Sequence, residues 1–93
     1  MRLLHGSNVD IVQPDLKMCQ SMNDFGRGFY LTPQWQRAYL MAKRRAGRDG
    51  GKPVVNPFLY YPTSTQEQVS QFGDKYTQYC FCTNKALKVL IKE

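Results

Sequence analysis

One stretch of the chain has the period of an amphipathic helix, and this constrains the fold more than any other feature. Thr32-Pro33 has the residue types that favour a helix start, and Gly47 with the Gly50-Gly51 pair supplies a stop. Apolar residues recur between them at steps of three and four: Trp35, Ala38, Tyr39, Ala42 and Ala46. The pattern predicts one main helix over about 33–47, with Trp35 and Tyr39 on its buried face.

Short β-prone runs flank this helix, and they indicate an α+β fold in a single domain covering residues 1–93. Residues 2–5, 29–31 and 78–83 have the apolar and aromatic composition of short strands. Residues 52–62 are also apolar, but three prolines limit them to an edge strand or to two short pieces. Residues 66–72 favour a short second helix, and residues 84–93 favour a turn or helical start followed by a last strand.

Size and cysteine content exclude several classes of protein. With 93 residues the chain forms one domain with a small core. The three cysteines are an odd number, and the spacing of Cys80 and Cys82 does not fit a zinc site, so we expect buried reduced thiols and no metal. No signal-peptide pattern is visible and no apolar run approaches the roughly 20 residues of a membrane span, which predicts a cytoplasmic protein with no membrane partner.

The chain is basic, with a net charge of +6. Much of the positive charge lies in and after the predicted helix: Arg37, Lys43, Arg44, Arg45, Arg48 and Lys52. Such a cluster can attract nucleic acid or a phosphorylated ligand. It is equally typical of a solvated helix face whose basic C-terminal turn suits the helix dipole. The sequence leaves both interpretations open.

Three short motifs combine apolar residues with one polar or aromatic residue that could contact a ligand. They are Leu4-His5-Gly6-Ser7, the run from Phe25 to Thr32, and the run from Gln78 to Thr83. In this order they resemble the histidine, tyrosine and third motifs of diphtheria-toxin-like and poly(ADP-ribose)-polymerase-like ADP-ribosyltransferases. All three also resemble a bacterial family, domain of unknown function 3990. The resemblance implies a compact, partly truncated ADP-ribosyltransferase-like split β-sheet with NAD as substrate, and toxins or effectors as analogues.

The resemblance also implies roles for individual residues. His5 would hydrogen-bond a ribose hydroxyl of NAD, with the Gly6 backbone on the nicotinamide amide and Ser7 near the ribose. Tyr30 would stack on the nicotinamide ring, and Gln78 would take the place of the usual catalytic glutamate. A neutral imidazole suits a ribose hydroxyl because it offers one donor and one acceptor, and a tyrosine ring provides a flat stacking surface. The predicted catalytic residues are therefore His5, Tyr30 and Gln78.

A glutamine at the third motif predicts weak or lost activity. Its carbonyl oxygen can accept a hydrogen bond from the 2′-hydroxyl of the ribose, but it carries no charge to stabilise an oxocarbenium-like centre. The resemblance therefore implies slow mono-ADP-ribosyl transfer to a protein or nucleic-acid acceptor, or binding without turnover. Relatives are longer between the second and third motifs, so a homodimer or a partner subunit could complete the cleft. The alternative is a non-catalytic basic module that binds nucleic acid or an acidic protein.

Overall fold

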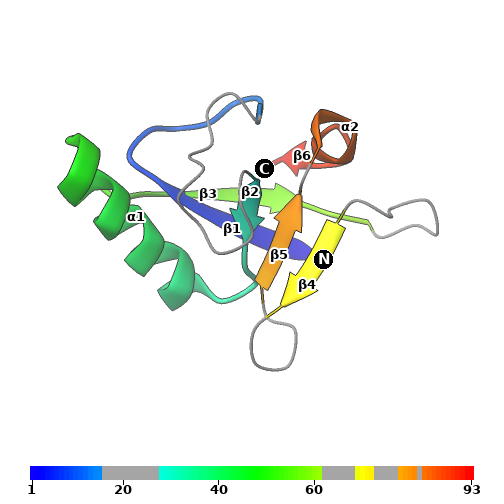
Figure 1. The fold of residues 1–93 in the computed structure, drawn as a ribbon, viewed down its shortest axis with the longest axis horizontal. Helices are drawn as coiled ribbons and strands as arrows, with labels where there is room; N and C mark the ends of the chain where they lie inside the picture. Colours follow the sequence, from blue (N-terminus) through cyan, green and yellow to red (C-terminus); the bar gives the residue numbers. More distant parts are fainter. Residues whose placement is uncertain (16–27, 62–68, 73–77, 82) are drawn as a thin grey trace.

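A computed structural model describes residues 1–15, 28–61, 69–72, 78–81 and 83–93 (Figure 1). These residues form six strands and two helices in an α+β arrangement. The strands are β1 (Arg2–Ser7), β2 (Phe29–Leu31), β3 (Val54–Leu59), β4 (Val69–Phe72), β5 (Gln78–Phe81) and β6 (Ile91–Lys92). The helices are α1 (Trp35–Asp49) and α2 (Asn84–Leu87). One main helix and one short helix are confirmed, as is the α+β class.

The strands form two antiparallel sheets, which one backbone bridge joins within the described residues. One sheet has the order β1-β3-β6 and the other the order β2-β5-β4. In the described part of the chain, β1 and the segment after β2 are joined by one isolated bridge, Leu4 to Thr32. Both backbone bonds of this bridge are short, 2.8 Å for Leu4 N to Thr32 O and 2.9 Å for Thr32 N to Leu4 O. The result is a split arrangement, in which the strands diverge on one side of the bridge.

The core lies on one face of this arrangement, because strand side chains alternate between faces. Phe29 and Leu31 of β2 and Tyr79 and Phe81 of β5 point into the same cluster as Phe58 of β3. The rings meet edge to face, with Phe29 and Phe58 centroids 5.9 Å apart at 83°. Leu87 of α2 also packs into this cluster, which explains why so short a helix is retained. Tyr30 and Cys80, the intervening residues, lie on the opposite face.

Helix α1 packs against the β1-β3 side of the molecule through its smallest residues (Figure 1). Ala38 and Ala42 are fully buried, whereas Trp35 is 56% exposed and Tyr39 is 37% exposed. The prediction that Trp35 and Tyr39 belong to the core is therefore wrong. Close contact with β1 admits alanine but not an indole or phenol ring, so the two aromatic residues fall on the flank of the helix.

The helix boundaries also differ from those predicted. Gln34 is the N-cap and makes no side-chain capping bond, while Thr32 joins the bridge to Leu4 and its Oγ1 accepts the Gln34 N–H at 3.1 Å. Thr32 thus lies two residues before the N-cap and does not cap the helix itself. Gly47 remains inside the helix, and the positive φ angles of Gly50 and Gly51, 90° and 87°, end it.

Two strand predictions are wrong. Residues 69–72, expected within a second helix, form β4, because pairing with β5 overrides their local preference. β3 is a central strand instead of an edge strand, since it lies between β1 and β6. Pro57 is tolerated there because it faces Leu4 at a pair whose backbone groups point away from each other. The expected helical start and last strand after residue 84 are confirmed as α2 and β6.

Candidate functional site

The predicted site residue His5 lies where the split sheet opens. Register from the Leu4–Thr32 bridge would make Gly6 and Tyr30 the next bonded pair of an antiparallel ladder. Instead, the His5 ring donates from Nδ1 to the backbone oxygen of Tyr30 at 2.7 Å. The imidazole therefore links β1 to β2 just past the bridge. We call this place, between Gly6 and Tyr30, the fork.

The bond to Tyr30 fixes the chemistry of His5. Because a carbonyl only accepts, Nδ1 carries the proton and Nε2 is left as an acceptor in the neutral ring. The pKa of His5 is lowered from 6.5 to about 4, mainly by burial and to a smaller extent by the charges of Arg45 and Lys92, against the opposing effect of the Tyr30 carbonyl. His5 is therefore neutral at pH 7, with one tautomer and a defined acceptor nitrogen.

Packing also fixes the orientation of the ring. His5 stacks on Phe29, with centroids 3.9 Å apart and an interplanar angle of 17°. Asn56, fully buried and opposite His5 on β3, donates from Nδ2 to the Val9 oxygen at 3.1 Å and accepts the Ile11 N–H at 2.8 Å. Asn56 thus ties the segment after β1 to the strand that carries the imidazole.

Gly6 is buried, and it has both a structural role and a backbone edge that faces away from β3. A Cβ built on Gly6 would lie 2.1 Å from the Ala38 oxygen and 2.6 Å from the Ala42 nitrogen, so α1 occupies the space that any side chain would need. Its N–H and C=O face the same side of β1 as those of Leu4, because these directions alternate along an antiparallel strand. They therefore face the fork. Ser7, 1% exposed, is buried, and its hydroxyl reaches Asn8 Oδ1 at 3.5 Å.

Tyr30 and Gln78 share a face of the second sheet. Tyr30 is opposite Cys80, and Gln78 lies two residues before Cys80 on β5, so the two are diagonal neighbours. Tyr30 is only 8% exposed, whereas Gln78 is partly exposed. A Cβ on Gly28 would lie 2.3 Å from Cys80 Sγ, so the backbone on this face is closely packed over the thiol.

The predicted residues thus come together only in part. The His5 ring contacts the Tyr30 backbone, and Tyr30 and Gln78 are near neighbours in register. The His5 ring itself stacks on Phe29, whose side chain points to the face of β2 opposite the Tyr30 ring. The start of the second motif, residues 25–27, and Cys82 of the third lie outside the described residues. The sequence analysis did not identify two residues that support the His5 ring and its strand, Phe29 and Asn56. The signal available for Asn56 was a single amide side chain within an otherwise apolar strand.

Across the residues with described positions, no group of three or more His, Cys, Asp or Glu side chains could hold a metal ion. In the same part of the chain, no helix has both the length and the apolar character that crossing a bilayer requires. Cys80, the thiol described, is buried as expected.

Residues 1–76 match the family described as protein of unknown function (DUF3990). The chain belongs to the DUF3990 family. The matched range includes His5, Gly6, Ser7 and Tyr30 and ends before Gln78, so the family model covers the fork but not β5. No curated protein and no solved structure matches this chain.

Proposed function

We propose that this DUF3990 protein binds NAD at the fork and is an ADP-ribosyltransferase-like protein with weak or lost mono-ADP-ribosyl transfer. The observation that carries the proposal is the state of His5: neutral, held in one tautomer by the Tyr30 carbonyl at 2.7 Å, and next to the Gly6 backbone edge. A sheet that divides at this point is also the arrangement that the resemblance implies.

His5 would bind the ribose. Its Nε2 is an acceptor of fixed direction, which suits a ribose hydroxyl as donor. A ring that changed tautomer, or that was protonated at pH 7, would not keep this acceptor. The stack on Phe29 and the bond to Tyr30 restrict the ring before any ligand arrives, which reduces the entropy lost on binding.

Gly6 and Tyr30 would bind the nicotinamide group. The Gly6 N–H and C=O present one donor and one acceptor toward the fork, which matches the oxygen and the NH₂ group of a carboxamide. Ser7 would lie beside the ribose. Stacking on Tyr30 requires its ring to uncover a face, because only 8% of the residue is exposed. The side chain would therefore rotate, or the two sheets would separate further, when nicotinamide binds.

Gln78 would limit the chemistry. Its amide oxygen can accept from the 2′-hydroxyl, but no carboxylate at this position balances the positive charge that develops as nicotinamide leaves. Loss of a transition-state partner of this kind costs about 2.7–4 kcal/mol, or roughly 10²- to 10³-fold in rate. Any acceptor, protein or nucleic acid, would therefore be modified slowly.

Calorimetric titration with NAD tests binding. We expect saturable heat with the wild-type chain and a loss of at least about tenfold in affinity for His5→Gln, which keeps a donor toward Tyr30 but lacks the imidazole acceptor. Lys88→Ala, at an exposed position outside the site, is the control and should bind as wild type. Absence of heat and of any thermal shift at millimolar NAD would contradict the proposal.

The second test restores the missing charge. Gln78→Glu should raise NAD hydrolysis by roughly 10²-fold, because a carboxylate would stabilise the oxocarbenium-like centre. Gln78→Asn is the control, since it keeps the amide and should stay at the wild-type rate or below. An unchanged rate for Gln78→Glu, with NAD still bound, would place the reacting centre elsewhere.

A further inference from the structure

The outward side of α1 carries large apolar side chains that the fold does not bury. Trp35 is 56% exposed, Tyr39 is 37% exposed and Leu40 is 53% exposed. The rings of Trp35 and Tyr39 are stacked, with centroids 5.0 Å apart and planes 12° from parallel. Two nearly parallel aromatic planes thus form a flat step along one flank of the helix, next to Ala38 and Ala42, through which the helix packs against β1.

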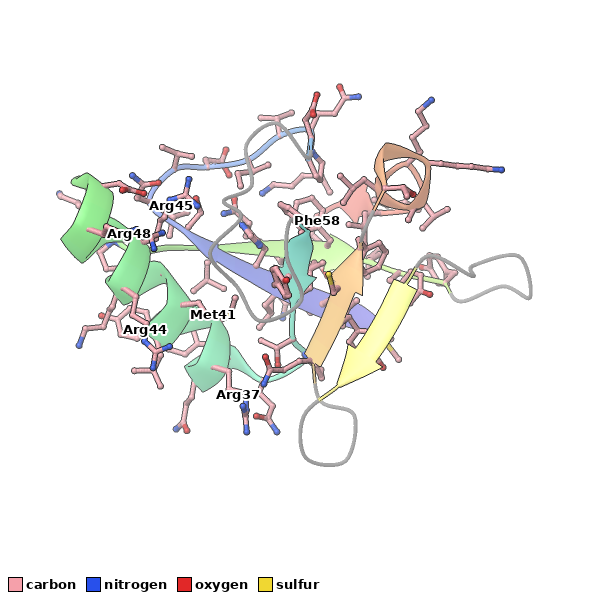
Figure 2. The ribbon with its side chains drawn as sticks, viewed as in Figure 1. Arg37, Met41, Arg44, Arg45, Arg48 and Phe58 are labelled. Atoms are coloured by element: carbon pink, nitrogen blue, oxygen red, sulfur yellow. The ribbon has the colours of Figure 1, made fainter. Side chains whose placement is uncertain are left out.

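Positive charge lines the same helix. Between residues 35 and 49, α1 has five basic side chains and a single acidic one, Asp49. Lys43 Nζ lies 5.8 Å from the Tyr39 ring centroid, so it extends the aromatic row by one helical turn. Figure 2 shows Arg37, Arg44 and Arg48 spread along the length of α1. Their spacing of seven and four residues makes a second row, with the exposed Leu40 between the two rows.

We propose that the exposed surface of α1, which extends from Trp35 and Tyr39 on one flank through Lys43 and Leu40 to Arg44 and Arg48 on the other, binds single-stranded nucleic acid. Bases would stack on the Trp35–Tyr39 step, and Lys43, Arg44 and Arg48 would contact the phosphates on either side. Exposed aromatic rings beside a row of cations are the combination with which proteins hold unpaired strands without reading their sequence. The inference goes beyond the proposed function, because none of these residues takes part in NAD binding at the fork.

The geometry favours a single strand over other anionic partners. An acidic peptide or an anionic membrane would use the positive charge, but neither needs two rings held nearly parallel at stacking distance. A duplex keeps its bases stacked on each other and would use only the cations. Arg37 Nε donates to Gln34 Oε1 at 2.6 Å, and Arg48 Nε lies 3.5 Å from Asp49 Oδ1, so both are partly engaged within the helix and contribute less than Arg44.

Fluorescence anisotropy with the full chain and a labelled oligothymidylate of about 12 nucleotides tests the proposal. We expect a Kd of about 1–100 μM at low salt, with a slope of log affinity against log salt near −2 for about three phosphate contacts. Trp35 is the single tryptophan of the chain, so stacking should quench the intrinsic fluorescence during the same titration. No binding at low salt, or binding without quenching, would overturn the proposal.

Two double variants separate stacking from charge. Trp35→Ala/Tyr39→Ala should weaken binding at least about tenfold and leave the salt slope unchanged. Arg44→Ala/Arg48→Ala should reduce the magnitude of the slope by about 1.4. Lys85→Ala/Lys88→Ala removes the same charge from exposed positions in and just after α2, and should do neither.

The proposal fails if that lysine control weakens binding as much as the arginine pair does, because attraction would then follow net charge alone. It also fails if duplex DNA, polyglutamate or vesicles with anionic lipid compete better than the oligonucleotide. All the substituted residues are exposed, and thermal unfolding of each variant should stay near wild type, which distinguishes lost binding from lost structure.

Discussion

The two edges of β1 are treated very differently in this fold. Toward β3, all six residues of the strand are paired, from Arg2 with Leu59 to Ser7 with Val54. Toward β2, the described residues pair at the Leu4–Thr32 bridge alone. The paired edge holds the strand in place, and the separated edge gives the His5 ring its carbonyl partner and leaves the Gly6 backbone directed toward the fork. In the proposed function, one edge of β1 supplies stability and the other edge binds the ligand.

The largest effect on stability should come from the close contact between Gly6 of β1 and helix α1. Gly6→Ala brings a methyl group against backbone atoms of α1, the Ala38 oxygen and the Ala42 nitrogen, which cannot move aside without shifting the helix. We expect a loss of about 3 kcal/mol or more in the free energy of unfolding, measured by urea denaturation. Gly47→Ala is the matched control: nothing lies within 4 Å of its Cβ, and helix propensity should leave it neutral or stabilise it by about 0.5–1 kcal/mol. Equal stabilities for the two variants would mean that α1 does not approach β1 this closely.

A second change breaks the polar support behind the fork. Asn56→Ala removes the acceptor of the Ile11 N–H and the donor to the Val9 oxygen, and leaves these groups without a buried partner. The expected cost is about 2–3 kcal/mol in the free energy of unfolding. Asn8→Ala, which removes an exposed bond to the Gly50 oxygen, should cost less than about 1 kcal/mol. A variant at Asn56 as stable as the one at Asn8 would show that the segment after β1 is held by other contacts.

The separated edge should show its own dependence on pH. The pKa of His5 falls from 6.5 to about 4 on folding, so the unfolded chain binds more protons between these values. The contribution of the neutral His5 ring to the free energy of unfolding is therefore fully present above about pH 6.5. It decreases as pH falls toward 4, by about 2 kcal/mol between pH 7 and 5. Because His5 is the single histidine, the difference between wild type and His5→Gln across this range isolates its contribution. Parallel pH profiles for the two chains would contradict a buried neutral ring.

The smallest effect concerns the outer end of the paired edge. Arg2 Nε lies 3.1 Å from Glu93 Oε1, but the Arg2 side chain is 62% exposed. Arg2→Ala should lower the free energy of unfolding, measured by thermal unfolding, by no more than about 0.5 kcal/mol, since solvent and salt screen such pairs. A larger change would mean that the ion pair, and not the ladder alone, secures β1 beside β3 and β6.

The sequence predicted where helices and strands form better than it predicted which strands pair and which side chains are buried. The aromatic run of β2 and the alanine spacing of α1 are local signals, and both elements formed where expected, within two residues. The central position of β3 and the strand β4 were missed, because each depends on pairing with residues distant in the chain or across a turn. Trp35 and Tyr39 were misplaced for a related reason: periodicity gives the apolar side of a helix, but the glycine on β1 selects which part of that side is buried.

The candidate site shows the same division. The resemblance implied that His5 and Gly6 contact the same ligand, and this stays a prediction; the structure places both residues at the fork. The imidazole contact with the Tyr30 backbone could not be predicted, because it requires the two strands to separate one pair after the bridge. Nor could the support from Asn56, whose partners Val9 and Ile11 are more than 40 residues away in the chain.

The separation in sequence between β1 and β3 has a consequence for synthesis of the chain. Ser7 pairs with Val54 and Arg2 with Leu59, so β1 cannot form its ladder with β3 until residues about fifty positions later have left the ribosome. Leu3 and Leu4, both buried in the finished fold, stay in water during this interval. The chain loses the entropy of closing this long loop before the contacts between β1 and β3 form, and this makes the ladder a slow step of folding. During translation, β1 is therefore the segment for which a chaperone or an early aggregate would compete.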